Sequence, residues 1–70
     1  MPANDMSVGD DFPRQQARVR EVLGYYKEIG PAGAFGAATI EATLRRADAA
    51  MASGDIVAIL RSYQEMKEVQ

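Results

Sequence analysis

The chain has 70 residues, a formal net charge of −2, and neither cysteine nor histidine. This composition excludes disulfide bonds and thiol nucleophiles, removes the usual neutral-pH acid–base residue and most zinc chemistry, and argues against a nucleic-acid partner, which favours a basic surface. Hydrophobic residues make up 47% of the chain, but twelve of them are alanines, which bury little area. We therefore expect a single small domain that gains further burial as a homo-oligomer.

Residues 1–11 are predicted to form a disordered N-terminal tail, and residues 12–70 a single helical domain. The tail contains three aspartates and few large apolar side chains, so it lacks the material for a packed core. It also lacks the basic residues of a secretory signal, and no apolar run in the chain is long enough to span a membrane. We expect a soluble protein of the cytoplasm.

A first helix is predicted near residues 13–29. Its apolar side chains recur at helical spacings, namely Val19, Val22, Leu23, Tyr26 and Ile29. The opposite face carries Arg14 and Arg18, and four of the five charged residues from Arg14 to Lys27 are basic. This basic face is a candidate surface for a protein partner, although an ordinary solvated face would show the same pattern. Tyr25 lies outside the apolar stripe, where its ring is available to a partner or a ligand.

A central helix near residues 31–53 is the element around which the chain is organised. It is rich in small residues, and one face carries an apolar stripe of Gly33, Ala37, Ile40, Leu44, Ala47 and Met51. Pro31 suits the first turn of a helix, and Gly54 suits the left-handed residue that ends one.

The start of this central helix supports two hypotheses. Glycines near a helix N-terminus let an anion approach the free N–H groups. In that hypothesis Gly33 and Gly36 admit the ligand, Phe35 and Tyr25 present their rings, and Lys27 neutralises charge. However, the segment has neither a preceding strand nor the Gly-Lys-Ser/Thr ending of a phosphate-binding loop. The alternative, which we prefer, is that the small residues allow close packing of helices.

A third helix is predicted near residues 55–68, joined to the central helix by a tight hairpin at Ser53, Gly54 and Asp55. Asp55 is a suitable N-cap, and an apolar stripe follows it, consisting of Ile56, Ile59, Leu60, Tyr63 and Met66. The predicted fold is therefore an all-α, three-helix domain that forms oligomers. A DNA-binding helix-turn-helix is disfavoured, because the third helix offers too few basic residues.

Residues 25–66 resemble a group of small uncharacterised helical proteins encoded by bacteriophages and prophages of proteobacteria. The most distinctive parts of this resemblance are the GPAGAFG run at Gly30–Gly36 and the SGD run at Ser53–Asp55. The resemblance implies an accessory role in the cytoplasm of a host cell. It carries over neither an activity nor any binding residues.

These observations predict a non-enzymatic binding protein. No catalytic residues, metal ligands or cofactor are expected, because the chain offers no nucleophile with an adjacent base. The leading hypothesis is an inhibitor of a host or anti-phage defence component that acts through protein–protein contact. One alternative is an oligomeric protein that sequesters a nucleotide or another anionic small molecule at the central helix, and a further alternative is a structural or assembly protein of the virion.

Overall fold

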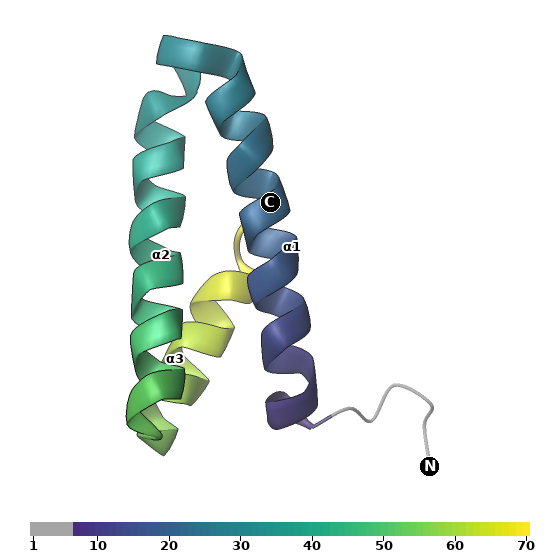
Figure 1. Ribbon diagram of the computed structural model, residues 1–70, viewed down its shortest axis with the longest axis vertical. Helices are drawn as coiled ribbons and strands as arrows, with labels where there is room; N and C mark the ends of the chain where they lie inside the picture. Colours follow the sequence, from purple (N-terminus) through teal and green to yellow (C-terminus); the bar gives the residue numbers. More distant parts are fainter. Residues whose placement is uncertain (1–6) are drawn as a thin grey trace.

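The computed structural model describes residues 7–70, and these residues form an all-helical domain, as predicted. Figure 1 shows α1 (Val8–Ile29) and α2 (Ala34–Ser53) side by side as a long hairpin, joined by a turn of 3-10 helix, η1 (Gly30–Gly33). The shorter α3 (Ile56–Lys67) crosses behind both helices over the half of the hairpin that holds the α2–α3 turn. The molecule is long and thin, with extents of 43 × 28 × 14 Å.

The first helix begins at Val8 rather than near residue 13, and it continues through Pro13. The hydroxyl of Ser7 accepts a hydrogen bond from the backbone N–H of Asp10, which caps the helix, and Asp10 and Asp11 place negative charge in the first turn. Residues 7–11, which were expected to belong to a disordered tail, are therefore the cap and first turn of α1. The rest of the expected tail, residues 1–6, lies outside the described residues.

The core is formed where all three helices meet. Its buried members are Phe12, Val19, Ile40, Leu44, Ala47 and Met66. Phe12, close to the start of α1, is fully buried and stacks on Tyr63 of α3, with 6.4 Å between the ring centroids. Burial of this ring gives the first turns of α1 a tertiary contact, which explains why the helix extends upstream of the proline.

The predicted apolar stripe of the central helix is buried from Gly33 to Ala47, but its last predicted member, Met51, is not buried. Met51 is 40% exposed, and Ala50 is buried in its place. Ala50 lies at the crossing of α2 and α3, together with Ala58 and Ser62. Because a small side chain is needed where two helices approach closely, the alanine faces α3 and the methionine faces outward.

The α2–α3 turn has the predicted caps. Gly54 adopts the left-handed conformation with φ 72°, and its N–H donates to the carbonyl of Ala50. The carboxylate of Asp55 accepts hydrogen bonds from the N–H groups of Val57 and Ala58 at 3.0 and 3.3 Å. These two residues reverse the chain within a very short connection, so that α3 folds back over the hairpin.

Candidate functional site

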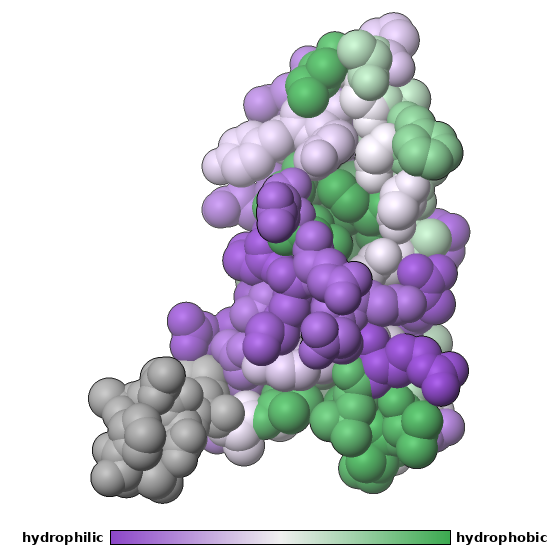
Figure 2. Space-filling model, turned by 180° about the vertical axis from the view of Figure 1, so that it is seen from behind, coloured by the Kyte–Doolittle hydropathy of each residue, from purple (hydrophilic) through white to green (hydrophobic). Residues whose placement is uncertain are grey.

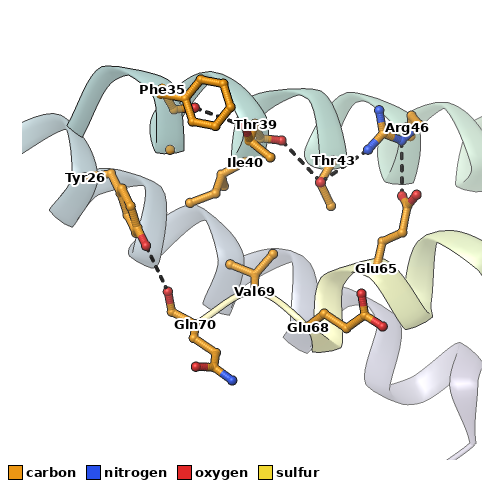
Figure 3. Close-up of a pocket in the computed structure, with 11 residues that line it drawn as sticks. Tyr26, Phe35, Thr39, Ile40, Thr43, Arg46, Glu65, Glu68, Val69 and Gln70 are labelled. Carbon is orange, nitrogen blue, oxygen red and sulfur yellow. Dashed lines mark hydrogen bonds and ion pairs between the residues drawn. The ribbon is translucent and has the colours of Figure 1, made fainter. Parts of the chain in front are cut away.

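The α1–α2 hairpin is longer than α3, and this difference leaves an opening that we call the open groove. It is a pocket of about 460 Å³ beside the end of α3, lined by eleven residues from α1, α2, α3 and the three residues that follow α3 (Figure 3). Figure 2 shows a hydrophobic hollow in the upper half of this face and hydrophilic side chains below it.

The interior of the open groove is apolar. Ile40 of α2 is only 6% exposed, and Val69, just beyond α3, packs against the core from the other side. The ring of Tyr26 closes the groove toward α1, where its hydroxyl donates a hydrogen bond of 3.4 Å to the carbonyl of Gln70. Phe35 lines the groove as well but is 86% exposed. An exposed phenylalanine next to a concave apolar surface is typical of a binding site.

The charged side chains of the open groove are mainly acidic. Glu65 and Glu68 line it together with a single cationic group, Arg46. The Nε of Arg46 lies 3.1 Å from Oε1 of Glu65, so this pair is mutually neutralised, and it bridges α2 and α3 (Figure 3). Within the described part of the chain, the carboxylate of Glu68 has no ion-pair partner. The groove therefore favours a ligand with a positive charge and disfavours an anion.

The two glycines predicted to admit an anion are instead covered by Tyr26. A Cβ added to Gly33 would clash with the backbone carbonyl oxygen of Tyr26 and lie 3.2 Å from the Cβ of Ile29. A Cβ added to Gly36 would clash with the Tyr26 ring. Both glycines thus allow α1 and α2 to approach closely at the top of the hairpin, and the geometry supports the packing hypothesis over the anion-binding one.

The other residues of the predicted ligand set are dispersed. The ammonium group of Lys27 lies 3.2 Å from a carboxylate oxygen of Glu41, and it does not line the open groove. Tyr25 is 59% exposed and also lies outside the groove. Only Phe35 and Gly36 of the predicted set line it, so the structure does not bring the five residues together.

Arg18, predicted as part of a partner-binding basic face, is engaged within the molecule. Its Nη1 and Nη2 donate hydrogen bonds of 2.9 and 2.6 Å to the carbonyls of Val69 and Met66, and its Nε donates to Gln15. The guanidinium therefore binds carbonyl groups at the C-terminal end of α3, where a positive charge is favourable. The carbonyl of Met66 also accepts a hydrogen bond from the N–H of Val69. Arg18 therefore holds α3 against α1, and a role for it in partner binding stays a prediction.

The remaining basic residues of this helix also have contacts within the chain. Arg14 is highly exposed, and its nearest guanidinium nitrogen lies 3.9 Å from a carboxylate oxygen of Asp11. Arg20 forms an ion pair of 2.7 Å with Asp48 of α2. The predicted basic face is thus largely a set of side chains that connect α1 to its neighbours.

One pair of titratable groups has shifted pKa values. The hydroxyl of Tyr63 donates a hydrogen bond of 2.6 Å to Asp11, which also accepts from the side-chain amide of Gln15. The bond from Tyr63 lowers the pKa of Asp11, and the bond to Asp11, together with burial, raises the pKa of Tyr63. Both shifts move the groups away from neutral pH, the opposite of what general acid–base catalysis needs. The pair connects the first turn of α1 to α3.

A second exposed feature lies on α3. Ile56, Val57 and Leu60 are 66%, 63% and 50% exposed, and helical spacing places them on one side of the helix, which we call the α3 apolar face. The sequence predicted Ile56 and Leu60 to face the core. However, the side of α3 that packs on the hairpin carries Ser62 and Met66.

Residues 7–70 contain no group of three or more acidic side chains arranged to hold a metal ion. In the same range, every helix is too short or too polar to cross a membrane.

The chain matches no protein-family model, and comparisons with curated proteins and with solved structures found no match. No activity can therefore be carried over from a relative.

Proposed function

We propose that this chain is a non-enzymatic binding protein whose open groove holds a segment of a partner protein. The partner segment presents one or two apolar side chains to the interior of the groove and a lysine or arginine to its acidic rim. The observation that carries this proposal is the combination of a concave apolar interior with Glu68, a carboxylate that has no ion-pair partner among residues 7–70.

The size of the groove supports such a ligand. A pocket of about 460 Å³ falls within the usual range of about 300–1,000 Å³ for binding sites. Because the interior is formed by α2 and by Val69, which packs on the core, it is formed before the partner arrives. A preformed site needs little ordering of its own side chains on binding, and this favours affinity.

The resemblance to phage and prophage proteins supports the biological setting of the proposal. A small accessory protein that occupies the surface of a host or anti-phage defence component inhibits it without any chemical step. The partner class rests on that resemblance, whereas the binding chemistry rests on the groove.

The alternative of a nucleotide-sequestering protein has less support. An anion in the open groove would meet Glu65 and Glu68, with only Arg46 as a counter-charge, and Arg46 is already paired. Tyr26 covers Gly33 and Gly36, and Lys27 is paired with Glu41. A virion structural or assembly role is a prediction that the groove neither favours nor opposes.

The proposal can be tested by NMR titration of the full chain with three probes. The first is a short peptide with one leucine and one phenylalanine flanked by lysines, the second replaces those lysines with glutamates, and the third is ATP. We expect the lysine peptide to shift the amide signals of Gly36, Thr39 and Thr43, and the glutamate peptide and ATP to leave them unchanged.

Matched substitutions assign the binding to the groove. Phe35→Ala and Glu68→Lys should each weaken binding of the lysine peptide about tenfold. Tyr25→Ala and Glu28→Lys change an exposed aromatic ring and an exposed carboxylate outside the groove, and they should have no effect. Binding of ATP at these amides would support the sequestering alternative instead. Equal binding of both peptides would contradict the proposed charge preference.

A further inference from the structure

A second pocket continues the open groove along the junction of α2 and α3, and we call it the α2–α3 pocket. Its volume is about 370 Å³. Arg46 and Glu65 line both pockets, and Figure 3 shows their ion pair at the end of the open groove away from Tyr26. From Thr43 in the open groove through Arg46 to Ala50 in the second pocket, the α2 residues follow at spacings of three and four, which places them on one face. The two pockets are therefore consecutive parts of one crevice, separated by this ion pair.

The charge of the α2–α3 pocket is opposite to that of the open groove. Arg46 and Glu65 neutralise each other at 3.1 Å. The other charged residue that lines the pocket is Arg61, and it forms no ion pair with any residue from 7 to 70. The open groove thus has the free carboxylate of Glu68, whereas the α2–α3 pocket has a free guanidinium.

The hydroxyl of Ser62 opens into the α2–α3 pocket. Ser62 is only 4% exposed and lines the pocket, and its hydroxyl makes no hydrogen bond within residues 7–70. Because every sealed side-chain nitrogen or oxygen in this range has a hydrogen-bond partner, the oxygen of Ser62 is reached through the pocket. Buried polar groups are normally hydrogen-bonded. A free hydroxyl beside a free guanidinium offers two kinds of donor to a carboxylate, for which such bonds are strong.

We propose that the α2–α3 pocket binds an acidic side chain of the same partner segment whose basic side chain lies in the open groove. This inference rests on the proposed function and adds the second charge of the ligand. The carboxylate accepts hydrogen bonds from the guanidinium of Arg61 and the hydroxyl of Ser62, while the basic side chain meets Glu68. Between these positions the segment passes over the Arg46–Glu65 pair, whose side chains are 54% and 35% exposed.

The spacing of the two free charges sets the spacing expected in the ligand. Glu68, the C-cap of α3, has helical backbone angles and follows Arg61 by seven residues, so both lie on one side of the helix. At a rise of about 1.5 Å per residue they are about 10 Å apart along the axis. An extended peptide spans this distance in about three residues. The reversed placement would bring like charges together at both positions, so the two charges also fix the register.

Two peptides test the inference by calorimetric titration of the full chain. Both extend the lysine peptide at each end by two glycines and a third residue, which is glutamate in one peptide and glutamine in the other. Extension at both ends makes the test independent of the direction in which the segment lies. We expect the glutamate peptide to bind about tenfold more tightly. In NMR spectra, the glutamate peptide alone should shift the amide signals of Arg61 and Ser62.

Protein variants assign the difference between the peptides to the α2–α3 pocket. Arg61→Gln should abolish the difference, and Ser62→Ala should reduce it. Arg45→Gln is the matched control, because Arg45 is an exposed arginine of α2 that lines neither pocket, and it should keep the full difference. A difference that persists in Arg61→Gln would overturn the assignment, and one that persists undiminished in Ser62→Ala would remove the hydroxyl from the site.

The same titrations distinguish failure of this inference from failure of the proposed function. If both peptides shift the amide signals of Gly36, Thr39 and Thr43 and bind equally tightly, the open groove holds the segment and the α2–α3 pocket does not. If neither peptide shifts those signals, the proposed function fails, and the inference fails with it.

Discussion

At the scale of single residues, Tyr26 controls the top of the hairpin. Its backbone carbonyl lies against Gly33, its ring lies over Gly36, and its hydroxyl donates to the carbonyl of Gln70. Tyr26 therefore sets the distance between α1 and α2 through its backbone and its ring, and the ring also forms a wall of the open groove. Because the space for a Cβ is already filled at both glycines, their role is steric and does not depend on a ligand.

Substitution of two glycines by alanine should have opposite effects on stability. Gly33→Ala should lower the free energy of unfolding by about 1–3 kcal/mol, because the new methyl group meets a backbone oxygen that cannot rotate away. Gly24→Ala is the control, since a Cβ there meets nothing within 4 Å, and it should raise stability by about 0.5–1 kcal/mol through helix propensity alone. Urea denaturation measures both. A Gly33→Ala protein as stable as the wild type would contradict this account of the hairpin.

At the scale of helices, the sequence predicted the three helices correctly but placed the start of the first helix several residues too late. Pro13 suggested a beginning at that residue, because proline is favoured in the first turn of a helix. The better signal lay upstream, where Ser7 caps the helix, Asp10 and Asp11 follow, and Val8 and Phe12 stand four residues apart. Residues 1–11 resembled a disordered tail because this stretch is acidic and polar and holds few large apolar side chains.

The contacts between helices could not be read from spacing alone. Arg18 has the position of a solvated residue on α1, and its hydrogen bonds to Met66 and Val69 join residues that are 48 and 51 positions apart. Likewise, α3 carries more apolar residues than one packing face can bury, and only the crossing angle decides that Met66 is covered and Leu60 is not. The sequence did contain a sign of the open groove. The predicted third helix was shorter than the other two, so it could not cover the whole length of the hairpin.

The hydrogen bond from Tyr63 to Asp11 links α3 to the first turn of α1, and it should make the stability of the fold depend on pH. The folded-state pKa of Asp11 lies below its ordinary value of 3.8, so the contribution of this group is present above that pH and is lost as the pH falls through the folded pKa. The folded-state pKa of Tyr63 lies above its ordinary value of 10.0, so its contribution is present below that pH and is lost as the pH rises through the folded pKa.

Tyr63→Phe should therefore destabilise the protein by a nearly constant amount between about pH 5 and pH 9. The difference from the wild type should shrink in more acidic and in more alkaline solution. Thermal unfolding across the pH range measures this difference, and Tyr25→Phe, which alters an exposed tyrosine, should give a flat profile close to zero. A Tyr63→Phe difference that stays constant from pH 2 to pH 11 would show that the bond to Asp11 contributes nothing.

At the scale of the whole molecule, one face carries two distinct surfaces. The open groove lies in the upper half of the view in Figure 2, and the α3 apolar face lies at its lower end, with hydrophilic side chains between them. The open groove exists because α3 is shorter than the hairpin, whereas the α3 apolar face exists because α3 carries more apolar residues than its packing side buries. A partner segment in the open groove therefore leaves the α3 apolar face uncovered.

Hydrogen exchange should show whether a partner segment binds in the open groove. In dilute protein, the amides of residues 35–39 should exchange faster than those of residues 43–47, because α3 packs near the latter and leaves the upper hairpin open. Adding the lysine peptide should slow exchange at residues 35–39 only. If the lysine peptide also slowed exchange at residues 56–60, the groove and the α3 apolar face would be coupled parts of one interface.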